Sequence, residues 1–566
     1  MKAFTEPLLS LAGFEEMTKT AEKSSGLISV TGCIDAQKSQ MIYAFGGHRK
    51  NKLIVTFGEQ KAKELYDEYS FFDKEVVYYP SKDVLFYQSD IRGNLLTAER
   101  IRALKAIHEQ ESVTLVTTFD ALMNTMAPIE KMWENVLTLE QGQLLDLKEI
   151  QAALIRMGYE KEYQVQTMGQ FSVRGGILDV FPLTEENPIR IELWGDEIDT
   201  IRYFDCESQK SIENTDRVSI YPAAELVLSD EEKAGGIEKL KAEAKRVSDK
   251  LRKQMKTEEA HRVTVMADEL TEEWGELSMY AGMDAFLSYF FDERVGILDY
   301  FNPSDSLIFF DELTRCAEQG KLTETEFSES MKQRLAMGYI LPGQMNGLFT
   351  EKEIVAKLGK YSCIALAALD NKANGLHQLG SYGIHCQSVS PYNNSFELLI
   401  KDLKRYKKNG YRVILLSGSR TRAKRLSEDI TDQGITCFYT ENYDHELFEG
   451  QIMVCYGKVR RGFEYPILKF AVITESDIFG AQQKKKKRHR TYEGEKIQSF
   501  TDLSVGDYVV HENHGLGIYR GIEKLEVDKK VKDYIKIEYQ GGSNLYILAT
   551  QLDMIQKYAG KDARKP

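Results

Sequence analysis

The sequence predicts a multidomain α/β protein that contains an inserted α+β unit and ends in a small β-barrel. From residue 27 to about 126, short apolar strands alternate with amphipathic helices, which is typical of a parallel sheet covered by helices on both faces. Antiparallel strand patterns with tight turns follow between 170 and 205. Closely spaced short strands recur beyond residue 508, as in a small barrel.

Length and composition narrow the class of protein. A chain of 566 residues is too long for one hydrophobic core and suggests roughly three to five domains. Its 42% hydrophobic and 28% charged residues are typical of a soluble globular protein. The net charge of −13 argues against a dedicated nucleic-acid binder, although local basic patches stay open.

The cysteine spacing and the length of the apolar runs indicate in which cellular compartment the protein is found. The seven cysteines include no C-x-x-C pair and are odd in number, so we predict neither a zinc site nor a disulfide framework. No apolar run approaches the ~18 residues of a membrane helix, and the first residues lack the apolar core of a secretory signal. We therefore expect a reducing, cytoplasmic location.

The first α/β domain is predicted over 1–128 and again over 215–385. Its expected strands are 27–30, 52–57, 76–79, 113–118, 296–300 and 306–310, with helices over 59–69, 97–109 and much of 222–276. Between its two parts we predict an inserted unit, 129–214, with a helix over 144–157 and strands over 170–173, 176–181, 189–193 and 198–205. Tight turns between these strands favour a curved antiparallel sheet.

Three further segments complete the chain. An additional α/β domain is predicted over 386–480, with helices over 398–408 and 420–431 and strands over 411–416, 452–456 and 470–474. Residues 481–499 form a basic linker. Residues 500–566 form the barrel, with strands over 508–511, 517–525, 532–539 and 545–547.

The stretch 32–39 has the outline of a nucleotide-binding loop. It reads G-C-I-D-A-Q-K-S, whereas a phosphate-cradling loop has the pattern G-x-x-x-x-G-K-[ST]. Gly32, Lys38 and Ser39 match, but Gln37 replaces the second glycine, which lets backbone N–H groups approach the phosphates. We interpret the loop as a degenerate nucleotide site; an intact ATP site and a chance match are the alternatives.

Asp311 and Glu312 follow the apolar residues 307–310. In a nucleotide hydrolase, such an Asp holds magnesium and such a Glu orients the attacking water. The alternative is a strand end whose acids are solvated or cap a helix. With Gln37 in the loop, we interpret this pair as a remnant of the same site.

Three motifs carry weaker signals. The run 484–490, K-K-K-K-R-H-R, can contact phosphates, but no aromatic residue interleaves it, and a solvated linker is the simpler interpretation. His511 and His514 lack a nearby third ligand, so no metal is predicted. The S-G-S stretch at 417–419 lies between a strand and a helix, where it can hold an anion or cap the helix.

The strand predicted over 170–173 leads into an R-G-G turn at 174–176. Strand alternation places Phe171 and Arg174 on opposite faces. An exposed arginine at a sheet edge can anchor a partner's carboxylates. From spacing alone, an ordinary solvated arginine is the favoured interpretation.

The stretch 170–182, Q-F-S-V-R-G-G-I-L-D-V-F-P, resembles the insertion domain of the repair protein UvrB. The stretches 116–128 and 192–205 are more similar to the bacterial transcription-repair coupling factors (Mfd) than to UvrB. In that family the inserted domain docks UvrA. The resemblance therefore implies a UvrA-binding surface, with Arg174 as the first candidate and Phe171 and Lys161 as weaker ones.

The stretch 509–519, V-V-H-E-N-H-G-L-G-I-Y, is similar to the start of the RNA-polymerase-interacting domain of the same family, and 545–547 and 556–560 fit it as well. The resemblance implies a Tudor-like barrel, shared with CarD-type transcription factors, that binds the RNA polymerase β subunit through an exposed strand edge. Ile522 and Leu525 are the positions expected to face the polymerase.

The resemblance extends over essentially the whole chain. It implies a degenerate helicase-like domain with a UvrB-type insertion, and the family is known for a degenerate loop at the position of Gln37. The family continues into a DNA translocase with its own ATP site, whereas this sequence stops at Pro566 without a second such motif. We therefore expect an N-terminal portion without a motor and without a cofactor, since ATP and magnesium belong to the translocase region.

These observations predict an adaptor that binds a stalled RNA polymerase and recruits UvrA for nucleotide excision repair, without ATPase activity of its own. Binding to DNA is expected to be weak if it occurs, and no membrane is involved. Two alternatives stay open. One is an ATP-dependent, UvrB-like DNA-repair helicase subunit, and the other is a CarD-like transcription regulator.

Overall fold

The computed structural model describes residues 1–46, 49–82, 94–276, 283–369, 375–480, 494–496, 503–511, 515–527, 530–538, 544–548 and 555–558. None of the helices in these ranges combines the length and apolarity that crossing a bilayer requires. Within the same ranges, no group of three or more His, Cys, Asp or Glu side chains could hold a metal ion.

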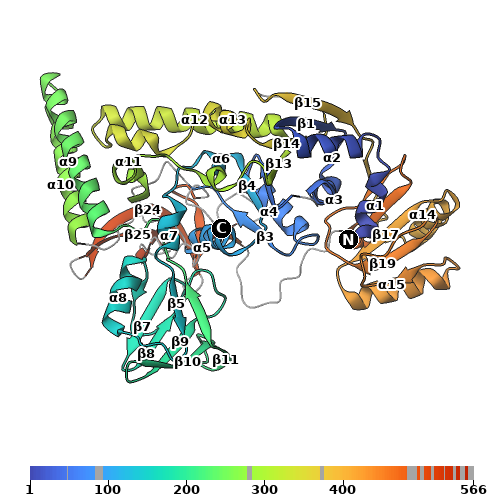
Figure 1. Ribbon diagram of the computed structural model, residues 1–566, viewed down its shortest axis with the longest axis horizontal. Helices are drawn as coiled ribbons and strands as arrows, with labels where there is room; N and C mark the ends of the chain where they lie inside the picture. The colour runs from blue at the N-terminus through green and yellow to red at the C-terminus, as the bar shows by residue number, and fades with distance from the viewer. Residues whose placement is uncertain are drawn as a thin grey trace.

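A seven-stranded sheet, parallel throughout, lies in the middle of the molecule (Figure 1). Its strands, in spatial order, are β15 (Gln378–Gly383), β1 (Gly26–Thr31), β14 (Ser362–Leu366), β13 (Ser306–Asp311), β2 (Asn51–Thr56), β4 (Thr114–Thr118) and β3 (Val76–Tyr79). Strands β13 and β14, from beyond the insertion, pair between β1 and β2. The predicted parallel sheet is therefore confirmed, and both parts of the first α/β domain contribute to it.

Helices cover both faces of this sheet. They are α1 (Lys2–Leu9), α2 (Phe14–Lys23), α3 (Asp35–Gly46), α4 (Glu59–Tyr69), α5 (Asn94–Glu109), α6 (Phe119–Met123), α7 (Ile129–Trp133), α12 (Leu313–Ala336) and α13 (Glu351–Leu358). Along β2 the side chains alternate between two cores: Ile54 packs with α3 and α4, whereas Leu53 and Val55 pack with α5 and α12. This alternation follows from the two-residue period of a strand buried on both faces.

One predicted strand is wrong. Residues 296–300 were expected to be extended, but Ile297–Tyr300 form the 3₁₀ helix η2. The carboxylate of Asp299 accepts the N–H of Gly296 at 2.9 Å, which closes a tight turn. An apolar run of four residues cannot by itself distinguish a short strand from such a turn.

Two long antiparallel helices, α9 (Asp230–Lys253) and α10 (Thr257–Glu276), stand at the left edge of Figure 1. The short elements η1 (Met283–Phe286), α11 (Leu287–Phe290) and η3 (Pro342–Gly347) pack near their base. Ser229 and Glu232 form a capping box at the start of α9, which defines where this helix begins.

The insertion forms an antiparallel sheet in the lower part of Figure 1. Its strands, in spatial order, are β11 (Ser211–Thr215), β10 (Glu197–Phe204), β9 (Ile189–Trp194), β8 (Ile177–Val180), β7 (Gln170–Arg174) and β6 (Glu160–Lys161), of which only β6 and β7 are parallel. The sheet shares a core with α8 (Leu147–Arg156) and with the pair β5 (Leu137–Glu140) and β12 (Arg217–Ile220). β12 lies beyond the expected boundary at 214, and the domain limits stay predictions.

The additional α/β unit has a second, mixed sheet. Its strands, in spatial order, are β16 (Gln387–Ser388), β20 (Phe463–Tyr465), β21 (Phe470–Thr474), β17 (Arg412–Ser417), β19 (Ile452–Tyr456) and β18 (Phe438–Tyr439). Its helices are α14 (Phe396–Lys408), α15 (Arg420–Asp432) and α16 (Glu475–Phe479). Ile414 and Met453 of this sheet join the same core as Phe4 of α1, so the two α/β units pack against each other.

The last sheet is antiparallel. Its strands, in spatial order, are β22 (Gly494–Lys496), β27 (Ile555–Tyr558), β23 (Tyr508–His511), β24 (Gly515–Val527), β25 (Lys530–Glu538) and β26 (Asn544–Leu548). Strands β23 to β26 lie where strands were predicted. Strands β22 and β27 were not predicted, and β22 lies within the stretch 481–499 that was expected to be a linker. Closure into a barrel stays a prediction.

Candidate functional sites

The loop between β1 and α3 carries the residues that were predicted to form a degenerate nucleotide site. Only three residues, 32–34, separate the strand from the helix. Gln37, Lys38 and Ser39 therefore lie in the first turns of α3, and none of them is more than 1% exposed. The helix begins inside the eight-residue motif, which shortens the loop that would have to surround a phosphate chain.

The backbone N–H groups of this loop already have acceptors inside the protein. Gly32 and Cys33 donate to the carbonyl oxygens of Ala368 and Ala367, at 3.3 and 2.9 Å. Both acceptors lie just beyond β14, the strand next to β1. A phosphate cradle needs several such N–H groups free and converging on the ligand, and these two are engaged by the fold.

The ammonium group of Lys38 is enclosed by carboxylates. Its Nζ donates to Asp311 Oδ1, to Glu312 Oε1 at 2.9 Å and to Asp35 Oδ1 at 3.1 Å. The hydroxyl of Thr56 donates to the second oxygen of Asp311 at 2.9 Å. Burial alone would lower the pKa of Lys38, but the carboxylates outweigh it and raise the pKa above its ordinary value. The lysine charge is thus neutralised within the protein.

Gly32 and Gln37 are both packed against other parts of the protein. Gly32 has φ +80°, and a Cβ built there would lie 2.1 Å from the carbonyl oxygen of Ile384. The Gln37 side chain is wholly buried, and its amide atoms have no hydrogen-bond partner among the described residues. Nearby, burial raises the pKa of the Cys33 thiol to about 12. In this structure the N–H groups of Gly32 and Cys33 and the ammonium group of Lys38 are therefore engaged by groups of the protein itself.

In the inserted sheet, Arg174 at the end of β7 is part of a charged triad. It donates to Asp179 Oδ2 at 2.8 Å, and Arg190 donates to both oxygens of the same carboxylate at 2.7 and 2.8 Å. Asp179 is only 1% exposed, whereas the side chain of Arg174 is 36% exposed. The buried carboxylate holds Arg174 in place while part of its guanidinium group stays at the surface.

Sequence reasoning missed Asp179 and Arg190. The sequence does place an acid and a base on adjacent predicted strands. Only the register of these strands, in which Asp179 stands opposite Arg190, brings the two side chains together. Arg190 also lies over the ring of Phe204, with its Cζ 4.3 Å from the ring centroid. Three strands thus contribute to the position of one exposed arginine.

The two weaker candidates differ in exposure. Phe171 has no exposed surface and packs in the domain core with Leu178 and Ile191. Its place in the core corrects the prediction that it contacts a partner directly, because β7 directs this ring toward the interior. Lys161, on β6, is exposed, and its Nζ donates to Gln151 Oε1 at 2.7 Å.

The S-G-S stretch after β17 surrounds a carboxylate from the same chain. Glu475 Oε2 accepts the hydroxyl of Ser417 at 2.9 Å and the N–H of Gly418 at 2.6 Å, and the guanidinium of Arg422 pairs with Oε1. Ser419 caps α15, as predicted, by accepting the N–H of Arg422 at 3.2 Å. The anion position at this helix start is therefore filled by Glu475, a partner that the spacing of the motif did not reveal.

In the last sheet, Ile522 and Leu525 lie on β24. Residues 515–518 of this strand pair with β23, whereas 518–527 pair with β25. Among the described residues, the edge of β24 opposite β25 has no paired strand beyond Tyr519. Ile522 is half-buried and packs against the core of the sheet. Leu525 stands opposite Lys532 in the backbone register, and its side chain lies outside the described part of the structure.

Two other predicted motifs lie outside the described residues: the basic run 484–490, and His514 with the two residues before it. His511 ends β23.

Comparisons with known proteins identify relatives of this chain. The UvrB interaction domain matches residues 137–226, and the CarD-like/TRCF RID domain matches residues 503–559. The Transcription-repair-coupling factor of Bacillus subtilis is 30% identical over 516 residues, which are 91% of this chain and 43% of that protein. Those of Staphylococcus haemolyticus and Staphylococcus aureus are 29% and 28% identical, over 95% and 98% of this chain and 46% and 47% of theirs. The chain spans a little under half the length of these relatives.

Proposed function

Because the chain carries a UvrB interaction domain and a CarD-like/TRCF RID domain and is homologous to transcription-repair-coupling factors, we propose that it acts as the adaptor part of such a factor. Its inserted domain recruits UvrA, and its last domain binds the β subunit of a stalled RNA polymerase. Its first α/β domain is the scaffold that separates these two docking domains, and it does not hydrolyse ATP. The observation that carries the proposal is the presence of both docking domains in one chain, over 137–226 and 503–559.

The surface for UvrA is formed by the edge of the inserted sheet at β6 and β7. Lys161 is exposed there and Arg174 is partly exposed, and their strands are direct neighbours. Arg174 is already oriented by Asp179, so little side-chain entropy is lost when it meets an acceptor. A guanidinium group held in this way suits a carboxylate of the partner, because it presents several donors in one plane.

The test for this surface is Arg174→Ala, measured by titration calorimetry against purified UvrA. We expect affinity to fall at least about tenfold, which corresponds to about 1.4 kcal/mol. Asp179 keeps its two bonds to Arg190 in this variant, so the domain stays folded. The matched control is Arg217→Ala, which removes an exposed arginine from β12. Equal affinity of both variants for UvrA would refute the surface.

The polymerase contact is proposed at the open edge of β24, because an unpaired edge offers N–H and C=O groups to an added strand. The variant Leu525→Arg is expected to abolish binding to the polymerase β subunit in a pull-down with purified components. The matched control is Leu398→Arg on α14, which places the same substitution at a leucine that is 51% exposed and distant in sequence from β24. This control is expected to keep binding the β subunit. Retention of the β subunit by Leu525→Arg would overturn the contact assignment.

The absence of ATP binding is proposed from the engaged loop N–H groups and from the three carboxylates around Lys38. Each of these bonds would have to break before a phosphate could take its place. Titration of ATP and magnesium into the chain is expected to give no binding heat. A dissociation constant in the micromolar range would favour the UvrB-like helicase instead.

A further inference from the structure

The outer face of α9 is basic, although the chain as a whole carries a net charge of −13. Between residues 239 and 256 the sequence has eight Lys or Arg residues and only two acids, Glu243 and Asp249. All eight basic residues are exposed: Lys239, Lys241, Lys245, Arg246, Lys250, Arg252, Lys253 and Lys256. Glu243 is turned inward, where it accepts the hydroxyl of Tyr289 and the N–H of Gly343. Asp249 is exposed and lies between Lys245 and Arg252 on the same side of the helix, so this face is mainly but not wholly basic.

The helix is held rigidly from its other side. Ser248 donates to the carbonyl of Ala260 at 3.1 Å and lies 3.2 Å from the hydroxyl of Thr264, which fixes α9 against α10. At the base of the pair, a Cβ at Gly236 would lie 2.2 Å from the ring of Phe290, so the glycine permits close packing there. The basic face is therefore a fixed surface and not a loose charged segment.

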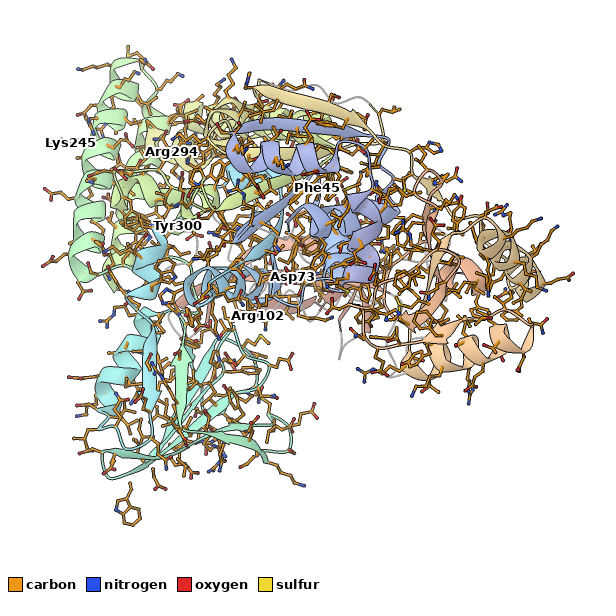
Figure 2. All side chains as sticks on the ribbon, turned by 45° about the vertical axis from the view of Figure 1, so that its right-hand side comes forward. Phe45, Asp73, Arg102, Lys245, Arg294 and Tyr300 are labelled. Carbon is orange, nitrogen blue, oxygen red and sulfur yellow. The ribbon has the colours of Figure 1, made fainter. Side chains whose placement is uncertain are left out.

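The charges follow the helix period. Lys241, Lys245 and Arg252 are separated by four and seven residues, so they lie along one side of α9. Figure 2 shows Lys245 on the side of α9 that faces away from the rest of the molecule. No hydrogen bond or ion pair engages these three side chains among the residues that the structure describes. The helical part of the basic segment, residues 239–253, is about 21 Å long at about 1.5 Å per residue, which matches roughly six base pairs of a duplex at about 3.4 Å each.

From this arrangement we infer that the basic face of α9 binds the phosphate backbone of a nucleic-acid duplex. A protein partner would need apolar or aromatic anchors at the centre of the contact. The outer face of α9 offers none: among the described residues, the exposed apolar side chains nearby are Met255 at the turn and Val265 on α10. Contacts made by lysine and arginine alone suit phosphates, and they carry no sequence preference.

The two helices also have opposite charge. α10 has seven Asp or Glu residues and one arginine, Arg262, whose guanidinium lies over the ring of Tyr339. The acidic neighbour repels a duplex on its own side, so the ligand is confined to the outer side of α9. This binding would be independent of the two docking domains.

The experiment is fluorescence anisotropy of a labelled random-sequence duplex of about 30 base pairs, titrated with the whole chain at about 50 to 200 mM salt. The test variant is Lys241→Glu/Lys245→Glu/Arg252→Glu. The control is Lys401→Glu/Lys404→Glu/Lys407→Glu, which reverses three exposed lysines on α14 and shifts the net charge by the same amount. Thermal unfolding checks that each variant is folded, and the milder Lys241→Gln/Lys245→Gln replaces the test variant if it does not fold.

We expect the log of the wild-type affinity to fall linearly with the log of the salt concentration. The test variant should bind at least about tenfold more weakly, with a slope shallower by about 2 to 3, since each phosphate contact contributes about 0.9. The control should retain most of the affinity. Equal affinity of wild type and test variant, an equal loss in both triple variants, or no binding by the wild type would each overturn the inference.

Discussion

At the scale of single residues, the ammonium group of Lys38 pairs with the buried carboxylate of Asp311 and with the partly exposed carboxylate of Glu312. A buried ion pair is a weak source of net stability, because desolvation offsets most of the attraction. Removal of one partner is different, since it leaves an uncompensated charge inside the protein. In this structure the charge of Lys38 is thus paired within the protein, at the position that a phosphate-binding lysine occupies in the motif.

The first prediction concerns this lysine. Lys38→Met is expected to lower the free energy of unfolding by about 3 to 5 kcal/mol, because Asp311 loses its counter-ion in a site that is 2% exposed. Urea denaturation at neutral pH measures the effect. Adding Asp311→Asn to the same chain should recover part of the loss. An unchanged urea midpoint for Lys38→Met would contradict the proposed structural role.

A second residue makes stability depend on pH. Glu68 on α4 is 8% exposed, and burial raises its pKa to about 7 despite nearby Arg460. Because the folded pKa lies above the unfolded value of about 4.3, the folded state binds more protons than the unfolded state between these values. The contribution of the protonated carboxyl is complete below about pH 4 and is lost as the pH rises through about 7.

The corresponding prediction is that Glu68→Gln is more stable than the wild type at about pH 8, by up to about 3 kcal/mol, and equally stable near pH 4. Glutamine keeps the shape of the neutral carboxyl without its ionisation. Urea midpoints of both proteins between these pH values provide the measurement. Parallel pH profiles of the two proteins would exclude Glu68 as the titrating group.

At the scale of elements, the connection between β1 and α3 is three residues long and turns at Gly32. Its φ of +80° and the nearby carbonyl of Ile384 leave no room for a side chain. We predict that Gly32→Ala lowers the free energy of unfolding by at least about 2 kcal/mol, through backbone strain and a steric clash.

Chemical denaturation tests this prediction, with Gly235→Ala as the control. Gly235 lies exposed within α9, where a Cβ would have nothing within 4 Å. Alanine there should stabilise the helix by up to about 1 kcal/mol. If both alanine variants had the same stability, Gly32 would not be required by the fold.

Across the whole molecule, α1 lies where the two α/β units meet. The ring of Phe4 has centroid distances of 5.6 Å to both Phe71 and Phe72 of the first unit and 6.4 Å to Tyr443 of the second. The backbone N–H of Ala3 donates to the carbonyl of Tyr443 at 3.0 Å. This short helix therefore joins the two sheets into one core.

We predict that Phe4→Ala lowers the free energy of unfolding by about 3 to 5 kcal/mol and separates the unfolding of the two α/β units. Differential scanning calorimetry should show two transitions in the variant and one shared transition of these units in the wild type. Leu9→Ala on the same helix, at 65% exposure, should change stability by less than about 0.5 kcal/mol. A single wild-type-like transition in Phe4→Ala would contradict the role of α1.

Most of the regular elements could be predicted from the sequence, because apolar periodicity is a local property. The helix at 59–69 and the strands at 76–79, 452–456 and 470–474 have the predicted limits. Segment 296–300 was too short for its pattern to separate a strand from a 3₁₀ turn. The pairing of β5 with β12 was also missed, since it joins residues near the two ends of the inserted segment, about 80 positions apart.

For the candidate sites, too, some features could be predicted from the sequence and others could not. By itself, the sequence determined which residues occupy the loop at 32–39, the acidic pair and the Arg174 turn, since motif spacing is written along the chain. Only the tertiary structure decided that Lys38 meets an acid 273 residues away, that Asp179 orients Arg174, and that Glu475 fills the helix start at 418. The reason is physical: strand order and register bring distant charges together, and burial then requires that each charge be paired.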